Sequence, residues 1–304
     1  MMKSLAIFSA PKPFRDNHIA TIQRNAIRSW QQLGDQVEII LVGDEEGLAE
    51  TAHELGVNHL SDVACNEKGT PLVSSIFSLA RENSSAPLLA YVNADILVLS
   101  DFLSMSLKMH SLAEKFILVG QRWDLDILTE MDFPRDWEEK FRQSILASGK
   151  LPPPAGSDYF IFPRSCYQEI PGFAIGRAGW DNWMIYQARR NGWMAVDATR
   201  SITIAHQQHD YAHLPGGKPH YKLPETDENI RLAGGREITR FSLLDVDHRL
   251  VSGLLRNRAW NRDTVRRMIE TFPLLVFNNY RLTQRITSLF QRLKNRNNSQ
   301  GGDH

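Results

Sequence analysis

The feature that most constrains the fold is an alternation, over the first 120 residues, of short apolar runs with longer segments of helical periodicity. Four apolar runs have the length of buried strands, at 5–9, 37–42, 88–92 and 116–120. Between the first two, apolar side chains recur at helical spacing from Ile19 to Leu33, and Gly34 follows as a stop signal. Strands that alternate with helices of this length predict an α/β fold with a mainly parallel sheet and helices on both faces.

The pattern changes at 151–154, where three consecutive prolines predict a linker or a rigid turn. Beyond it we expect a helix around 181–191 and strands around 194–196 and 202–205. The stretch 206–237 is rich in His, Gly and Pro, and we interpret it as a long functional loop. We expect four parts: a first half (1–150), a second half (151–250), a basic helical extension (251–296) and a disordered tail (297–304).

Charge and cysteine content exclude several classes of protein. The net charge is zero, but residues 256–304 carry ten Lys/Arg against three Asp/Glu, or +7, which leaves −7 for the first 255 residues. We therefore expect no nucleic-acid partner. Two distant cysteines, Cys65 and Cys166, make neither a disulfide framework nor a zinc ribbon, which is typical of a cytoplasmic protein. No apolar run approaches the ~20 residues of a membrane span.

Polar side chains follow three of the predicted strands, where ligands of open parallel sheets bind. These residues are Ser9, Ala10 and Pro11 after the first strand, Asp44 after the second, and Asn93, Ala94 and Asp95 after the run 88–92. Neither a GxGxxG after the first strand nor a GxxxxGK[ST] is present, so the sequence predicts no dinucleotide site and no P-loop. A carboxylate at a strand end suits a hard divalent ion that holds a diphosphate.

Taken in order, these segments resemble the nucleotide-sugar half of the GT-A glycosyltransferases of the family-2 type. The resemblance covers roughly 4–210 and is carried by the segments 7–11, 25–30, 38–44 and 91–96. It implies a GT-A-like fold with a Rossmann-like nucleotide-sugar-binding half (1–150) and an acceptor and catalytic half (151–250). It also implies transfer of a sugar from a nucleotide-diphosphate donor to an acceptor hydroxyl of a glycan, a lipid or a small molecule, with Mn²⁺ or Mg²⁺.

The resemblance implies a role for each strand-end segment. The segment 9–11 would contact the nucleotide, and Asp44 would accept hydrogen bonds from the base or the ribose. Asn93-Ala94-Asp95 matches the DxD motif, in which the final Asp binds the metal that bridges the two phosphates. This chain departs from the motif because Asn93 replaces the first carboxylate, so one ligand charge is missing while the amide can still hydrogen-bond a ribose.

The predicted loop at 206–237 holds further candidates. His206 and His209 are three residues apart, a spacing that permits joint ligation, and the resemblance implies that one of them completes the metal shell with Asp95. The alternative for each histidine is a surface or core-capping role. Lys218 follows two glycines and would close over the diphosphate as a lid, unless the Gly-Gly pair is only a turn.

Asp181, in the segment Gly-Trp-Asp-Asn-Trp (179–183), is the candidate base. A transferase that inverts configuration needs a carboxylate to take the proton of the acceptor hydroxyl. Trp180 and Trp183 would then stack on a sugar; the alternative is that Asp181 caps a helix and both tryptophans belong to the core. Asp158 is the second candidate, as an acceptor-binding residue.

The basic extension carries an apolar stripe at helical spacing among its arginines. The stripe consists of Leu282, Ile286, Leu289, Phe290 and Leu293. It predicts either an interfacial helix on anionic lipid, at the inner face of the membrane, or a helix packed on the domain with a solvated basic face.

Two other functions remain open at this stage. A sugar-1-phosphate nucleotidyltransferase would need a glycine-rich phosphate loop after the first strand, and Lys12 and Arg15 occur there without the glycines. A non-catalytic module that binds a nucleotide sugar or a glycan is favoured by Asn93 in the DxD position.

Overall fold

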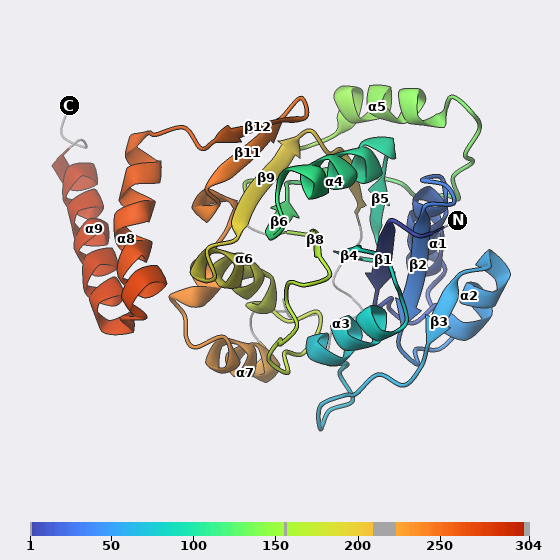
Figure 1. Cartoon of the computed structure of the whole chain (residues 1–304), viewed down its shortest axis with the longest axis horizontal. Helices are drawn as coiled ribbons and strands as arrows, with labels where there is room; N and C mark the ends of the chain where they lie inside the picture. The colour runs from blue at the N-terminus through green and yellow to red at the C-terminus, as the bar shows by residue number, and fades with distance from the viewer. Residues whose placement is uncertain (1, 155–156, 209–222, 301–304) are drawn as a thin grey trace.

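The structure is a computed structural model of the whole chain, and it describes residues 2–154, 157–208 and 223–300, with side chains as far as residue 292. In this described part, the main sheet has nine strands in the order β12-β11-β9-β6-β8-β4-β1-β2-β3 (Figure 1). These strands are β1 (Leu5–Ser9), β2 (Val37–Val42), β3 (Asn58–Leu60), β4 (Leu88–Val92), β6 (Phe116–Val119), β8 (Tyr159–Pro163), β9 (Met194–Arg200), β11 (His248–Val251) and β12 (Leu254–Asn257). β8 and β12 run antiparallel to their neighbours and the other pairs are parallel, which confirms the expected mainly parallel α/β sheet.

Helices cover both faces of this sheet, as the sequence predicts. Alternate side chains of β1 point to opposite faces: Ala6 and Phe8 join one buried cluster, and Leu5 and Ile7 join the other. The first cluster is completed by side chains of α3 (Val73–Glu82) and α6 (Trp180–Arg190). The second is completed by α1 (Asn17–Gln31), α2 (Leu48–Leu55) and α4 (Ser100–Leu112).

A second, three-stranded sheet crosses the edge where the site forms. Its strands, in the order β5-β10-β7, are β5 (Ile96–Val98), β10 (Ile204–Gln207) and β7 (Trp123–Leu125). Leu97, Leu125 and Ala205 from these strands pack against α5 (Trp137–Ser148) in a small core of their own. This sheet brings together residues about 80 to 110 positions apart in the sequence.

The second half of the chain is more regular than its composition indicates. The prediction of one long loop over 206–237 was wrong at both ends, because β10 includes His206 and Gln207, and α7 spans Pro224–Leu232. Pro224 occupies the first turn of α7, where a missing N–H costs no helical hydrogen bond, so this proline starts a helix instead of marking a loop. Residues 209–222 lie outside the described part of the chain.

The C-terminal part follows two short 3-10 turns, η3 (Ile238–Arg240) and η4 (Leu243–Asp245). The hairpin of β11 and β12 extends the main sheet across position 251, where we expected the helical extension to begin. Two helices then follow, α8 (Arg262–Phe277) and α9 (Tyr280–Gln300), and α9 continues through 297–300, part of the tail predicted to be disordered. Among the described residues, no helix has both the length and the apolar character of a membrane span.

Candidate active site

The site forms where strand ends of the main sheet meet the small sheet. Because β4 and β8 are antiparallel and Val92 pairs with Tyr159, the residue after β4 lies beside the residue before β8. The backbone N–H of Asn93 donates to the carbonyl of Asp158 at 2.9 Å, and the Asn93 amide Nδ2 donates to Asp158 Oδ1 at 3.0 Å. Asn93 therefore holds a carboxylate that the sequence places 65 residues away.

The small sheet places His206 between two carboxylates. In β10, His206 pairs with Ile96 of β5, the residue after Asp95, and with Asp124 of β7. Its ring Nδ1 lies 3.1 Å from Asp124 Oδ1, and its Nε2 lies 3.9 Å from Asp95 Oδ2. All three side chains are largely buried, at 13–17% exposure. Of the two histidines proposed as partners of Asp95, His206 therefore lies near it, with Asp124 in a position to orient the imidazole through Nδ1.

Arg122 joins this group to Asp158. Its Nη1 donates to Asp158 Oδ1 at 2.5 Å, and its Nε donates to Asp124 Oδ1 at 3.0 Å. Burial opposes the charge of Arg122, but the two carboxylates outweigh it and raise the pKa of the guanidinium. Neither Arg122 nor Asp124 was predicted from the sequence, although both charged residues fall within four positions after the apolar run 116–120, much as polar residues follow the other predicted strands.

The ammonium group of Lys12 lies near Asp95, in the same site. Burial lowers the pKa of its ammonium, and the negative charge of Asp95 acts in the opposite direction. Its backbone is fixed by Gln23, whose Oε1 accepts from the Lys12 N–H at 2.6 Å and whose Nε2 donates to the Lys12 carbonyl at 3.0 Å. A half-buried lysine near the carboxylate of Asp95 is well placed to meet a phosphate.

The other nucleotide-binding candidates also follow strand ends of the main sheet. Ser9 ends β1 and is fully buried, and its Oγ has no hydrogen-bond partner among the described residues. Pro11 is buried as well, and Ala10 packs against the first core cluster. Asp44 follows β2 and is exposed beyond Gly43, whose φ of +139° turns the chain out of the sheet.

Asp181 lies in the first turn of α6, and one carboxylate oxygen accepts from the Gly179 N–H at 3.3 Å. Its pKa is raised to about 6, because burial disfavours the charged form and the charge of Asp158 adds to this effect, while backbone N–H groups act against it. Asp181 and Asp158 therefore belong to one electrostatic neighbourhood. A carboxylate with a pKa near neutrality is suited to take a proton.

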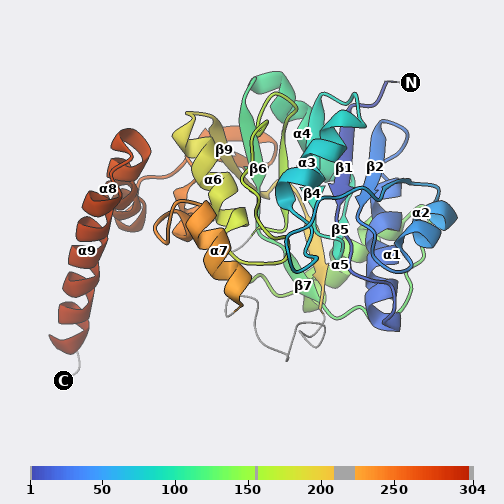
Figure 2. The same ribbon diagram turned by 90° about the horizontal axis from the view of Figure 1, so that it is seen from below.

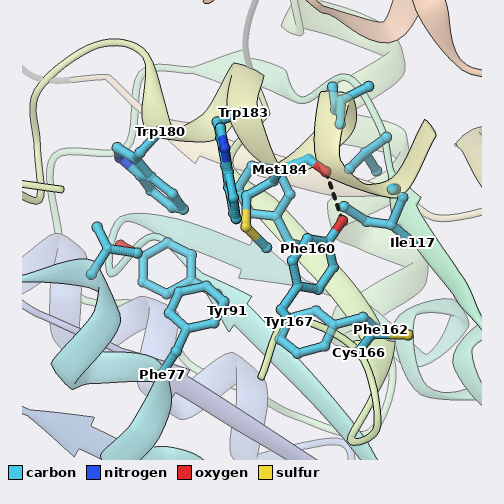
Figure 3. Packing of buried hydrophobic residues seen from close by; sticks show 14 of the residues in the cluster. Phe77, Tyr91, Ile117, Phe160, Phe162, Cys166, Tyr167, Trp180, Trp183 and Met184 are labelled. Atoms are coloured by element: carbon cyan, nitrogen blue, oxygen red, sulfur yellow. Dashed lines mark hydrogen bonds between the residues drawn. The ribbon is translucent and has the colours of Figure 1, made fainter. Parts of the chain in front are cut away.

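Trp180 and Trp183 take the second of the two roles that the sequence left open. Each is only 6% exposed, and both point into the aromatic core shown in Figure 3. The ring of Trp180 lies edge-to-face with that of Tyr91, with 5.1 Å between the ring centroids, and the ring centroids of Trp183 and Phe173 are 5.5 Å apart. The tryptophans anchor the start of α6 and with it Asp181, and they offer little ring surface to a sugar.

The residues present fit a divalent metal. Among the described side chains, no group of three His, Cys, Asp or Glu surrounds a common metal position. Asp95 and His206 nevertheless supply an oxygen and a nitrogen 3.9 Å apart, and Mg²⁺ or Mn²⁺ commonly takes its remaining ligands from water and phosphate oxygens. His209 and Lys218, the other ligand candidates from the sequence, lie outside the described residues.

Comparisons with known proteins give structural matches alone. No protein-family model matches the chain, and no curated protein matches it. Among solved structures, S. aureus TarS with UDP-GlcNAc is 13% identical, with a TM-score of 0.47 over 76% of this chain and 65% of that chain. A Pyrobaculum calidifontis mannosyltransferase with GDP-Man and Mn²⁺ is 11% identical, with a TM-score of 0.45 over 70% and 59%. Glucosyl-3-phosphoglycerate synthase from Mycobacterium tuberculosis, with Mn²⁺, UDP and phosphoglyceric acid, is 14% identical, with a TM-score of 0.43 over 68% and 72%.

These matches are glycosyltransferases that use nucleotide-diphospho sugars, the class that the sequence resembles. The chain spans less than two thirds of the length of the first two. Each of these TM-scores is below 0.5, so the three matches assign no role to any residue of this chain.

Proposed function

We propose that the chain is a glycosyltransferase that moves a sugar from a nucleotide-diphosphate donor to an acceptor hydroxyl. The observation that carries the proposal is the placement of Asp95 and His206 near the C-terminal ends of the parallel strands. Asp95 Oδ2 lies 3.9 Å from His206 Nε2, and Asp124 Oδ1 lies 3.1 Å from the other ring nitrogen, Nδ1. Ligands of such sheets bind at this edge. A diphosphate bound here would meet a metal-binding pair and the ammonium of Lys12 on the same side.

In this proposal Asp95 and His206 hold Mn²⁺ or Mg²⁺, which when bound neutralises charge on the leaving diphosphate. Asp124 accepts the Nδ1–H of His206 and so leaves Nε2 with its lone pair toward the metal. Lys12 contacts a phosphate. The segment from Ser9 to Pro11 lines the nucleotide, and Asp44 accepts hydrogen bonds from the base or ribose.

Asp181 acts as the base that takes the proton of the acceptor hydroxyl. Its pKa of about 6 leaves it ionised at neutral pH, yet basic enough to accept a proton as the hydroxyl attacks. The carboxylate of Asp158 already accepts hydrogen bonds from Arg122 and Asn93, so it is less free to contact the attacking hydroxyl of an acceptor. We assign Asp158 to binding the acceptor or orienting the Asp181 region, and we leave the acceptor class open among glycan, lipid and small molecule.

We place this reaction in the cytoplasm. Cys65 is exposed and Cys166 is buried, and both are free thiols, which fits a reducing compartment. The buried thiol has a raised pKa because its thiolate would be desolvated, so it is protected from oxidation.

The proposal is tested by a thermal-shift screen of UDP-, GDP-, TDP- and CMP-linked sugars with Mn²⁺, followed by measurement of nucleotide release from the best ligand. We expect one nucleotide class to raise the Tm and to be released slowly by hydrolysis without an acceptor. Asp95→Asn should abolish both effects. Asp35→Asn, which changes an exposed carboxylate just before β2, at the opposite end of that strand from Asp44, is the matched control and should keep both.

A chain that gains no stability from any nucleotide sugar and releases no nucleotide would contradict the proposal. Nucleotide binding that is equally strong without metal, with no release of nucleotide, would instead identify a non-catalytic binding module.

A further inference from the structure

The two C-terminal helices form a hairpin at one end of the molecule, beside the sheet domain (Figure 2). α8 contacts α6 and η4, while the main contacts of α9 in the described part of the chain are with α8. Arg267 of α8 holds the hairpin to the body through Asp245, with its Nε and Nη2 donating to the two carboxylate oxygens at 2.9 and 2.7 Å. The hairpin is thus firmly oriented and leaves its outer surface uncovered.

The hairpin buries polar side chains and exposes apolar ones. In α9 the buried residues with described side chains are Thr283 and Thr287. The buried positions of α8 include Thr264, Glu270 and Thr271 as well as Leu274, which joins the core of the body. Polar side chains inside and apolar side chains outside reverse the usual pattern of a helix on the surface of a soluble domain.

The outward apolar side chains of α8 form one continuous stripe. Its members recur at helical spacing and are 38–52% exposed: Val265, Met268, Ile269, Phe272 and Val276. Trp260 and Phe277, at 74% and 65% exposure, lie just before α8 and at its last residue, and Phe277 makes an edge-to-face contact with Phe272. A concentration of this kind marks an interaction surface, since singly scattered apolar residues are the norm elsewhere.

A hollow of about 520 Å³ opens within this surface between α8 and α9. Its apolar lining comes from Trp260, Val265, Ile269 and Phe290, and its polar lining from Asn261, Arg262 and Arg266. Guanidinium groups beside an apolar hollow match the phosphate and the acyl chain of a phospholipid.

The charge of the hairpin favours a lipid surface over a second copy of the chain as the partner of its outer surface. Four exposed arginines lie on the hairpin, Arg262, Arg281, Arg285 and Arg292, and its one exposed acid with a described side chain is Asp263. A symmetric dimer through the hairpin would bring two copies of this net positive charge together, with repulsion between them. An anionic bilayer supplies the opposite charge and an apolar interior.

We propose that the outer face of the α8–α9 hairpin docks the protein on an anionic phospholipid bilayer, with the α8 stripe inserted at the interface and the arginines among the headgroups. The sequence indicated only a stripe on α9, of which Leu289 is the most exposed member, at 56%. The larger lipid-facing surface belongs to α8. Docking here holds the body at the membrane without a spanning segment.

The experiment is co-sedimentation of the full chain with vesicles of phosphatidylcholine alone and of phosphatidylcholine mixed with phosphatidylglycerol. We expect binding to the mixed vesicles, weakened by salt. The variant Ile269→Ser, Phe272→Ser, Val276→Ser should bind more than about tenfold more weakly. Arg281→Gln with Arg285→Gln should weaken binding about 25-fold, from roughly fivefold per arginine near anionic lipid.

The matched control is Leu128→Ser with Leu146→Ser, which removes apolar side chains exposed at 74% and 82% away from the hairpin and should bind like the parent. Circular dichroism melting checks that every variant is folded. Equal binding by the triple variant and the parent, or equal binding of the parent to both kinds of vesicle, would overturn the proposal. So would a parent dimer that the triple variant dissociates, with no vesicle binding, because the surface would then join two copies.

Discussion

We predict that the loss of Arg122 destabilises the fold, because its guanidinium is shared by two buried carboxylates of the site. Its guanidinium donates to Asp158 at 2.5 Å and to Asp124 at 3.0 Å, and the two carboxylates are 10% and 17% exposed. Arg122→Met keeps much of the aliphatic bulk and removes the charge. Two largely buried carboxylates would then lose their common cation.

The expected cost follows from this burial. Removing one partner of a buried ion pair costs about 3–5 kcal/mol, and the 30% exposure of the Arg122 side chain lets water offset part of that loss. We therefore expect Arg122→Met to lower the free energy of unfolding by about 2–4 kcal/mol. The assay is urea unfolding followed by tryptophan fluorescence, with the midpoint and the slope compared with those of the parent.

A matched arginine provides the control. The side chain of Arg28 is 29% exposed, a fraction similar to the 30% of Arg122, but its partner Glu130 is 62% exposed. Arg28→Met should therefore lower the free energy of unfolding by less than about 1 kcal/mol. Adding Asp158→Asn to Arg122→Met should restore part of the lost stability, because it removes a buried negative charge that has lost its cation and keeps only the hydrogen bond from Asn93. The reasoning is refuted if Arg122→Met costs no more than Arg28→Met.

Further predictions concern three residues of the same site. Asp181→Asn should lower sugar transfer by about 10²–10⁴-fold, and the parent rate should rise with pH through about 6, the pKa of Asp181. The pKa of Asp181 is higher in the folded than in the unfolded chain, so the free energy of unfolding falls as pH rises through about 6 and the carboxylate becomes charged. Asp181→Asn avoids this loss. The variant should therefore have a higher Tm than the parent at ~pH 8 and no advantage at ~pH 4. Asn93→Asp would put a second carboxylate about 3 Å from Asp158 Oδ1. The repulsion should lower the free energy of unfolding in urea by about 1–3 kcal/mol at neutral pH, and by less in acid, where the carboxylates are protonated. An unchanged unfolding midpoint would contradict the contact between residues 93 and 158. Asp124→Asn should weaken Mn²⁺ binding by about 10–100-fold in calorimetry, and unaltered affinity would remove Asp124 as the residue that orients His206.

The strands and their ends were predictable because local patterns encode them. The apolar runs at 5–9, 37–42 and 88–92 coincide with β1, β2 and β4, since strands buried on both faces show as continuous apolar sequence. Parallel neighbours end at one edge, so the position of Asp95 at the end of β4 follows from the sequence once the fold class is known. That either His206 or His209 would join Asp95 was expected from the family resemblance alone.

The rest of the site depends on pairings that no local pattern records. Arg122 and Asp124 reach it through β7, a strand of three residues whose partner in β10 is about 80 positions away. The contact of Asn93 with Asp158 depends on β8 running antiparallel between two parallel strands. Trp180 and Trp183 were ambiguous for a different reason, because an aromatic pair at a helix start has the same sequence pattern in a core and in a sugar site.

The central claim is that Asp95 and His206 hold a divalent cation that a nucleoside diphosphate also binds. The most direct measurement is a Mn²⁺ titration of the full chain by electron paramagnetic resonance, with and without UDP or GDP. We predict that one of the two nucleotides tightens Mn²⁺ binding, that Mn²⁺ tightens binding of that nucleotide by the same factor, and that Asp95→Asn loses the coupling. Mn²⁺ and nucleotide that bind independently, or a coupling that survives in Asp95→Asn, would contradict the claim.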